Sequence, residues 1–316
     1  MSAHKFTVED LKTRLDKFLS ERLSDLPSDT GEAISRGKIQ RDIEAGAVKV
    51  NGKKAEESKF VIRQGDKISY TPITEVAPGP VNIPLDTLYN NHGLLIIDKP
   101  AGLVVHPGAG FKGDSLAQAL LYHFKDIHLV GEEGRSGIVH RIDKDTSGVM
   151  MVALTPEMYD HLKNAFEERK VKKEYIALVK GKIEDQHGKI DSPLGKSKKD
   201  FRKYTTDTKD MVREKPSLTE YSVMDYFTDG VDFFTQIKVK LHTGRTHQIR
   251  VHFSSLGFPL VGDSLYGGKK AGKLGLDRQF LHSSKIEVQL PNQEWVSAES
   301  KLPKDLQEIL SKLKKI

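Results

Sequence analysis

The chain has 316 residues, enough to bury a real core in one large domain or two domains, and its composition of 37% hydrophobic and 30% charged residues is typical of a soluble protein. No apolar run is long enough for a transmembrane helix, no secretory signal is visible, and the lack of cysteine excludes disulfides and thiolate chemistry and favours a reducing cytoplasm. The net charge of +6 favours a polyanionic partner such as nucleic acid, because lysine and arginine release counterions from phosphates.

The N-terminal segment predicts a small module that begins with two helices. Thr7 and Asp10 match a capping box at the start of the first helix. A second helix is predicted from Ser35 to Ala45, with Gly46 as its stop. The first helix is indicated by apolar residues at helical spacing, which are Val8, Leu11, Leu15, Phe18, Leu19 and Leu23.

A hairpin and a linker are predicted next. Residues 48–50 alternate and lead into Asn51 and Gly52, which both accept the positive φ of a two-residue turn. Residues 66–70 form a further strand pattern. The stretch 71–84 contains four of the chain's 13 prolines, and we therefore expect an extended linker there.

The remaining chain predicts a mixed α+β sheet, because strand and helix patterns alternate without a regular βαβ order. Residues 196–215 are polar, with eight Lys/Arg and four Asp/Glu, and predict a mobile loop that is either a surface insertion or an RNA contact. The C-terminal stretch predicts a basic amphipathic helix. The expected elements are strands at 94–97, 149–154, 173–179 and 231–241, and helices starting at Thr155, at 246–255 and at 302–316.

The segment from Gly137 to Gly148 concentrates carboxylates, bases and hydroxyls beside an apolar strand. Asp143 and Asp145 would share a face of an extended segment, as in a carboxylate glycosidase. A metal site would have to use His242, His247 and His252, but their spacing of five makes them diverge on a helix. Nucleophile-elbow and phosphate-loop motifs are absent from the sequence.

Four ordered blocks resemble the RluA-type pseudouridine synthases. The segment Val139-His140-Arg141-Ile142-Asp143-Lys144-Asp145-Thr146-Ser147-Gly148 is similar to the family signature, with Ile142 in place of the usual leucine. The other blocks are Lys99–Pro107, Lys173–Leu178 and Leu241–His252, the last continued by 257–263. The resemblance covers residues 88–300. It implies a mainly antiparallel catalytic sheet that isomerises uridine in RNA without a cofactor or a metal.

The resemblance also implies roles for particular residues. Asp143 corresponds to the catalytic aspartate, acting as nucleophile or base. Arg250 corresponds to the basic partner that holds its charge, and Tyr175 to the active-site tyrosine that stacks on uracil. Arg141 corresponds to the residue that helps displace the target base, which must leave its stack to be reached. Arg245 is expected to contact RNA.

Residues 12–70 resemble the alpha-L RNA-binding module first seen in a small-subunit ribosomal protein. The resemblance implies docking on folded RNA through phosphates and shape rather than base edges. Its expected RNA contacts are Arg14, Lys17, Arg36, Lys38 and Arg41.

We therefore expect an RNA-binding domain at 1–72, a proline-rich linker at 73–87 and a catalytic domain at 88–316. Residues 104–110 are most similar to the RluD-like branch, which implies large-subunit (23S) ribosomal RNA as substrate. Transfer RNA is the first alternative substrate, and a non-catalytic RNA-binding ribosome-assembly factor is the alternative function. A cytoplasmic monomer without membrane association is the default expectation.

Overall fold

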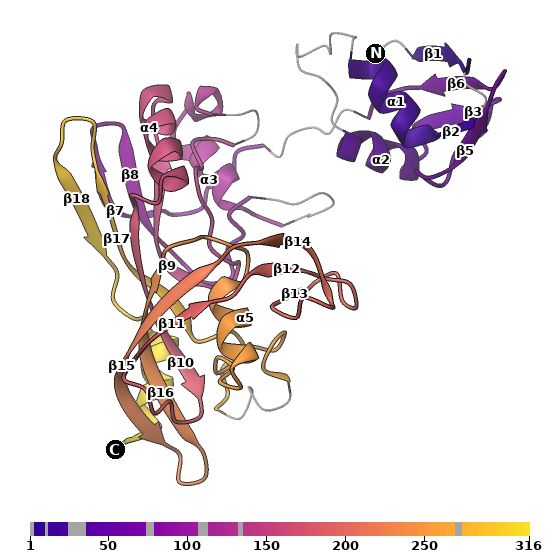
Figure 1. Cartoon of the computed structure of the whole chain (residues 1–316). Coiled ribbons are helices and arrows are strands. Elements are labelled where there is room, and N and C mark those ends of the chain that lie inside the picture. The colour runs from indigo at the N-terminus through magenta and orange to yellow at the C-terminus, as the bar shows by residue number, and fades with distance from the viewer. Residues whose placement is uncertain are drawn as a thin grey trace. The chain divides into compact units, whose positions relative to one another are not determined.

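The computed structural model describes residues 3–9, 12–24, 36–73, 79–106, 113–131, 135–268 and 274–316. The chain divides into two compact units, Met1–Ala77 and Pro78–Ile316, whose elements are labelled in Figure 1. None of the described helices combines the length and the apolar character needed to cross a bilayer. Pro107–Gly110, part of the predicted branch motif, and Pro78 of the predicted linker lie outside the described residues.

The first unit packs two helices against a small antiparallel sheet. Its main sheet has the strand order β1-β6-β3-β4, and β2 pairs separately with β5. Phe18, Ile39, Ile43 and Tyr70 are buried together in its core. Its elements are β1 His4–Thr7, β2 Lys12–Arg14, α1 Leu15–Ser24, α2 Arg36–Glu44, β3 Val48–Val50, β4 Lys53–Lys54, β5 Val61–Arg63 and β6 Lys67–Tyr70.

The predicted start of the first helix is wrong. Thr7 ends strand β1, which pairs with β6, and α1 begins only at Leu15. The apolar residues that predicted one helix are divided between the segment around strand β1 and helix α1. The segment 4–7 is a strand because it pairs with the distant strand β6. The capping-box partner Asp10 lies outside the described residues, as do Leu11 and Ser35.

The second helix and the hairpin are confirmed. Helix α2 is followed by Gly46 with φ of 80°, a left-handed conformation typical of a helix stop. Asn51 and Gly52 have φ of 51° and 81°, and they join the antiparallel strands β3 and β4. Two positive φ angles in succession are those of a type I′ turn.

The second unit is built on a ten-stranded sheet. Its elements are β7 Asp86–Asn91, β8 Leu94–Lys99, α3 Leu116–His123, a 3₁₀ turn Ile127–Leu129, β9 Ser147–Ala153, α4 Pro156–Glu167, β10 Lys172–Lys180, β11 His187–Asp191, β12 Leu194–Ser197, β13 Tyr204–Thr205, β14 Met211–Lys215, β15 Leu218–Thr228, β16 Phe233–Leu241, α5 Gln248–Ser255, β17 Leu281–Gln289, β18 Trp295–Glu299, α6 Lys304–Ser311 and β19 Lys314–Lys315. Thr155 caps α4 as predicted, accepting from the backbone N–H of Met158.

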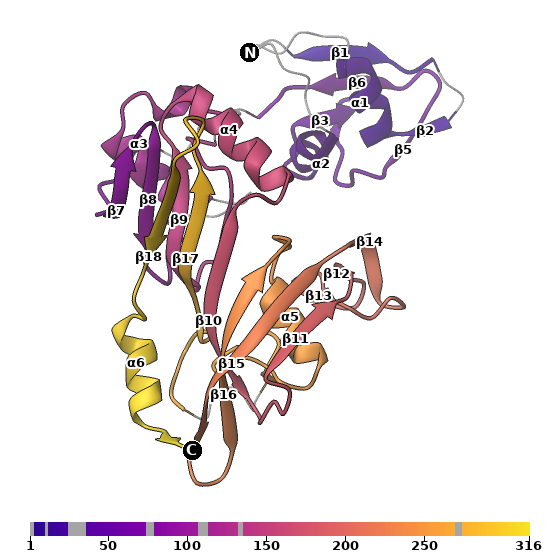
Figure 2. The same ribbon diagram turned by 60° about the vertical axis from the view of Figure 1, so that its left-hand side comes forward.

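The strand order of the large sheet is β11-β15-β16-β10-β17-β9-β8-β7, with β18 paired to β17 and β19 to β15. The described pairings in it are antiparallel except that of β9 with β17, which confirms the predicted mixed, mainly antiparallel sheet. Figure 2 shows β10 between the two halves of the sheet. At the β9–β17 junction only glycine fits at position 148, because a Cβ there would lie 2.1 Å from the Ser283 carbonyl oxygen.

Two predicted segments differ from the structure. Residues 196–215 are not one continuous loop: parts of the segment form a three-stranded sheet of order β13-β12-β14, anchored by buried Leu194 and Met211, and turns join these strands. The C-terminal helix α6 ends at Ser311 rather than Ile316, because the last residues pair with β15 as strand β19. In both places long-range packing outweighed the polar composition.

Candidate active site

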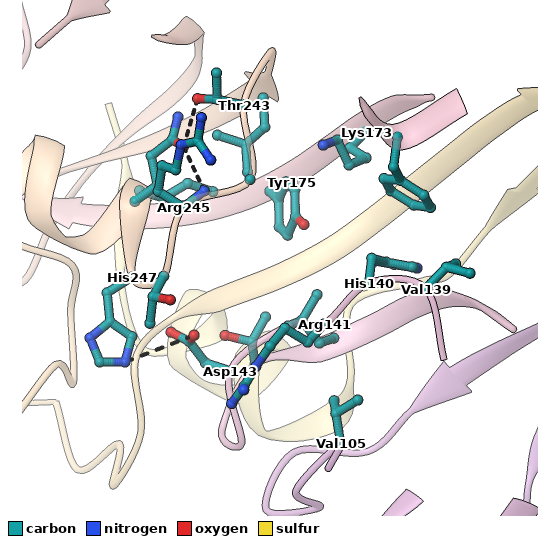
Figure 3. Close-up of a pocket in the computed structure, with 18 of the residues that line it drawn as sticks. Val105, Val139, His140, Arg141, Asp143, Lys173, Tyr175, Thr243, Arg245 and His247 are labelled. Carbon is teal, nitrogen blue, oxygen red and sulfur yellow. Dashed lines mark hydrogen bonds and ion pairs between the residues drawn. The ribbon is translucent and has the colours of Figure 1, made fainter. Parts of the chain in front are cut away.

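A cavity of about 590 Å³ lies beside strand β10, and Asp143 is one of its lining residues. Its walls come from the segment 138–146 that precedes β9, from β10, and from residues 241–250 that join β16 to α5. Figure 3 shows Asp143, Tyr175, Arg245 and His247 arranged around it. Three segments that are far apart in sequence therefore meet at the predicted catalytic aspartate.

Asp143 is held by Arg250, the basic partner predicted from the sequence. Arg250 Nη1 donates to Asp143 Oδ2 at 2.9 Å, and its other two nitrogens grip buried Asp263 at 2.7 and 3.0 Å. Burial alone would lower the pKa of Arg250, but the hydrogen bonds and charges of the two carboxylates raise it well above its usual value. The guanidinium is thus permanently charged and fixed in a fork between two aspartates.

The second carboxylate oxygen of Asp143 faces His247, which is hydrogen-bonded to Tyr266. His247 Nε2 lies 3.9 Å from Asp143 Oδ1, and its Nδ1 shares a 2.8 Å hydrogen bond with the Tyr266 hydroxyl. Tyr266 in turn accepts from the backbone N–H of Tyr204 on β13. Burial lowers the pKa of His247, so the ring is neutral at pH 7. The small sheet at 194–215 is therefore connected to Asp143 through Tyr266 and His247.

Tyr175 lies on β10 with 7% of its surface exposed. Burial raises the pKa of its hydroxyl to about 12; a hydrogen bond with Ser283 lowers it, and the charge of Asp143 raises it further. The phenol is accordingly protonated at neutral pH. It can donate a hydrogen bond or stack on a flat ring, but it is not a phenolate in the resting site.

Lys99 stabilises the loop that carries Asp143 by hydrogen bonds to backbone carbonyl groups. The Lys99 ammonium is fully buried and donates to the carbonyl oxygens of Pro100, Leu103 and Lys144 at 2.7, 2.9 and 2.9 Å. His140 shapes the loop from its other end by accepting from the backbone N–H of Met151. Burial lowers the pKa of His140 to about 3, so that it remains a neutral acceptor.

Arg141 and Arg245 both line the cavity, as expected for residues that meet RNA there. Arg141 is exposed. Arg245 is half-buried, and its Nε donates to the Pro216 carbonyl oxygen at 3.2 Å. This hydrogen bond restricts the orientation of the guanidinium group.

The expected RNA contacts of the first unit are largely organised by buried carboxylates. Asp16 has no exposed side-chain surface and accepts from Arg14, Arg36 and Gln40 at 2.7–3.2 Å. Lys38 pairs with Asp42 at 3.0 Å. In contrast, Lys17 and Arg41 are exposed, and Lys17 makes only a 3.7 Å surface pair with Glu21.

The alternative sites considered from the sequence do not assemble. Asp145 is absent from the cavity lining, whereas Asp143 is present, so the two do not form a glycosidase pair. His242 pairs with Glu220 and His252 is buried against Thr219, while His247 faces Asp143. Within the described ranges, no three His, Cys, Asp or Glu side chains come together as metal ligands.

Two contributors to the site had no predicted role. Asp263 and Lys173 occur inside the matching blocks. The place of Asp263 in the site depends on its contact with Arg250, 13 residues earlier in the chain, and that of Lys173 depends on which face of β10 is turned toward the cavity. The position of Lys173 two residues before Tyr175 was the available signal, because such residues share a strand face.

Comparison with known proteins identifies the class. Residues 93–255 match the family model described as RNA pseudouridylate synthase, and residues 13–68 match the S4 domain. An uncharacterized RNA pseudouridine synthase of Aquifex aeolicus (strain VF5) is 40% identical over 271 residues, covering 84% of this chain and 81% of the relative. The ribosomal large subunit pseudouridine synthase D of Yersinia pestis is 37% identical, covering 96% of this chain and 92% of the relative. The solved structure of human RNA pseudouridylate synthase domain containing 1 aligns with a TM-score of 0.61 and 27% identity, over 76% of this chain and 91% of that chain.

The fold and the site therefore define an RNA-modifying isomerase with an S4 RNA-binding domain. The chain belongs to the RNA pseudouridylate synthase family, which confirms the RluA-type resemblance and the predicted RNA partner. It is an RNA pseudouridine synthase, and neither a glycosidase nor a non-catalytic assembly factor is favoured.

Proposed function

We propose that this enzyme converts uridine to pseudouridine in large-subunit ribosomal RNA. Relatives that match nearly the whole chain at 35–37% identity, from Yersinia pestis and Haemophilus ducreyi, are named ribosomal large subunit pseudouridine synthase D. Such a substrate would place the enzyme in the cytoplasm, where ribosomes are assembled. One chain supplies Asp143, Tyr175 and Arg250, so we propose that it acts as a monomer.

The observation that carries the catalytic assignment is the Asp143–Arg250 contact at the cavity wall. An ionised carboxylate that is oriented by a permanently charged guanidinium is poised to act as nucleophile or as base at the ribose or the base. Tyr175, on strand β10, is proposed to stack on the uracil and to take part in proton transfer as a donor.

Arg141 and Arg245 are proposed to bind the RNA around the extruded nucleotide. A uridine inside a stem or loop must leave its stack at a cost of a few kcal/mol, and a guanidinium plane can fill the vacated space. Arg141 is exposed and lies two residues from Asp143, which suits that position.

The S4 domain is proposed to dock the enzyme on folded RNA, with residues 1–72 as the binding domain and 73–87 as the linker to a catalytic domain at 88–316. Its contacts would be Arg14, Lys17, Arg36, Lys38 and Arg41. Asp16 holds two of these arginines in fixed positions, where their outer faces can still meet phosphates because each side chain is more than 40% exposed.

Release of tritium from 5-tritiated uridine in ribosomal RNA tests this proposal. The RNA is purified from cells that lack the protein. The native enzyme should release tritium from large-subunit RNA, and Asp143→Asn should release none while binding the RNA with unchanged affinity. Release from transfer RNA alone would redirect the substrate assignment. Full activity of Asp143→Asn would contradict the catalytic role.

A further inference from the structure

The ammonium of Lys173 lines the same cavity, on the far side of Tyr175 from Asp143. Lys173 and Tyr175 are two residues apart on β10, so their side chains share a face and lie about 6.6 Å apart along the strand. Figure 3 shows Tyr175 between Asp143 and Lys173. The three residues thus form a row along the cavity wall.

The surroundings of the Lys173 ammonium are apolar or neutral. Its Nζ lies 5.6 Å from the centre of the Phe166 ring, whose centroid in turn lies 4.5 Å from the stacked ring of His140. Gly244, which also lines the cavity, lies next to the ammonium: a Cβ at this position would be 3.8 Å from Nζ. The missing side chain at this glycine leaves the ammonium uncovered toward the cavity.

Lys173 differs from the other lysines of its strand in having no carboxylate partner among the residues that the structure describes. Lys172 pairs with Glu287 at 3.2 Å, and Lys180 pairs with Asp232 at 2.7 Å. Burying an ammonium without a counter-charge is unfavourable, and burial lowers the pKa of Lys173 to about 8. A half-buried ammonium without a carboxylate partner on a cavity wall indicates a site for an electron-rich ligand atom.

We propose that Lys173 binds a carbonyl oxygen of the target uracil and stabilises the negative charge on the base while it is detached from the ribose. A uracil stacked on Tyr175 with its glycosidic bond toward Asp143 would turn a carbonyl edge toward Lys173. The inference rests on the proposed function of this cavity, with Asp143 at the reacting sugar.

The charge arises from the isomerisation itself. When the bond between N1 and C1′ breaks, its electron pair remains on the base and is delocalised onto the carbonyl oxygens. After the base turns, C5 supplies the electron pair for the new bond to C1′. C5 then loses its proton and N1 gains one, so product and substrate have the same composition. A fixed cation beside a carbonyl oxygen stabilises the anionic stage more than either neutral end state.

The rate should depend on pH through this lysine, with other groups as a background. As pH rises through about 8, Lys173 loses its proton and the cation disappears. Tyr175 remains protonated, since its pKa is raised to about 12, and His140 remains neutral. The ionisable residues that line the cavity with it are His106, Arg135, His140, Arg141, Asp143, Glu167, Arg169, Tyr175, His242, Arg245, His247 and Arg250.

Single-turnover rates of tritium release at saturating RNA, from pH 6.5 to 9.5, test the proposal in the full-length enzyme. Lys173→Met should lower the rate by about 100-fold, the loss typical of removing one oxyanion-stabilising group. Lys173→Arg should recover most of that rate and lack the decline above pH 8, because a guanidinium remains charged. Lys172→Met, on the opposite face of the same strand, is the matched control and should behave as wild type.

Measurements of RNA affinity and of thermal stability distinguish this catalytic role of Lys173 from a role in phosphate binding or in folding. The Kd for RNA should be unchanged in Lys173→Met, and its melting temperature should be no lower than that of wild type, because a half-buried charge without a carboxylate partner has been removed. A weakened Kd with an unchanged saturated rate would assign Lys173 to a phosphate and overturn the proposal. Equal losses in the Met and Arg variants, with the wild-type pH profile retained, would also overturn it. Inactivity of wild type on every RNA would instead overturn the proposed function.

Discussion

Arg250 contacts Asp143 through one guanidinium nitrogen, at 2.9 Å, and commits its other two nitrogens to Asp263. Asp263 does not line the cavity. One of its oxygens also accepts from the backbone N–H groups of Leu265 and Tyr266 at 3.0 Å, which fixes the carboxylate in turn. The orientation of the Asp143 carboxylate is therefore set, through Arg250, by a second aspartate that lies outside the cavity lining.

Asp263→Asn should lower both activity and stability. The neutral amide no longer balances the buried guanidinium, and breaking such a pair costs about 3 kcal/mol of unfolding free energy. Misplacing Arg250 should reduce the single-turnover rate by up to about 100-fold. Tritium release and thermal unfolding measure the two effects. The control is Asp305→Asn, which removes the partner of Arg278 in a pair outside this cavity. A rate change of equal size in the control would contradict the proposed link.

Lys99→Met should slow the reaction without weakening RNA binding. The substitution leaves the carbonyl oxygens of Pro100, Leu103 and Lys144 without their donor, and the last of these follows Asp143 directly. We expect a loss of about 10- to 100-fold in kcat as the loop loosens. Stopped-flow or quenched single-turnover assays check the rate, and filter binding checks the Kd. An unchanged kcat would show that the loop holds its shape without these hydrogen bonds.

Local signals were predictable from the sequence, and long-range ones were not. The cap at Thr155, the turn at Asn51 and Gly52 and the stop at Gly46 depend on neighbouring residues, and all three are present. The start of α1 depends on the pairing of β1 with the distant strand β6, and the strands within 194–215 depend on which residues of that segment pair with one another. Periodicity and composition contain no information about those partners.

The same division holds at the site. Asp143, Tyr175 and Arg250 were predicted because their blocks resemble a family. The fork of Arg250 between two aspartates depends on the turn that returns Asp263 to the first turns of α5. The uncompensated charge of Lys173 depends on which carboxylates are missing around it, and no linear pattern reports that.

Asp16 should make the stability of the S4 domain sensitive to acid. Burial alone would raise its pKa, but hydrogen bonds from Arg14, Gln40 and Arg36 lower it to about 2, against 3.8 for the ordinary group. Because the folded pKa is depressed, the stabilisation is present above pH 4 and is lost as pH falls toward 2. It amounts to at most about 2 kcal/mol, since the arginines are half-exposed and screened.

Urea unfolding of Asp16→Asn between pH 2 and 7 tests this. The variant should be less stable than wild type at pH 7, and the difference should disappear near pH 2. Circular dichroism follows the whole chain, while the sole tryptophan, Trp295, reports on the second unit and serves as an internal control. A shift in the Trp295 transition, or a difference that persists at pH 2, would refute the assignment.

Lys17 and Arg41 should contribute to RNA affinity and not to chemistry. Both are exposed in the S4 domain, and neither touches the cavity lining. Replacing both by glutamine should raise the Kd for large-subunit RNA and reduce the slope of log Kd against log salt by about 1 for each phosphate that is no longer neutralised. The single-turnover rate at saturating RNA should stay unchanged, because the flipped uridine meets the same residues. Lys182→Gln is the matched control, since Lys182 makes a 3.7 Å surface pair like that of Lys17 but lies in the catalytic unit. If the control weakens binding as much as the double variant, the effect is one of general charge, and a specific docking role for the S4 domain is wrong.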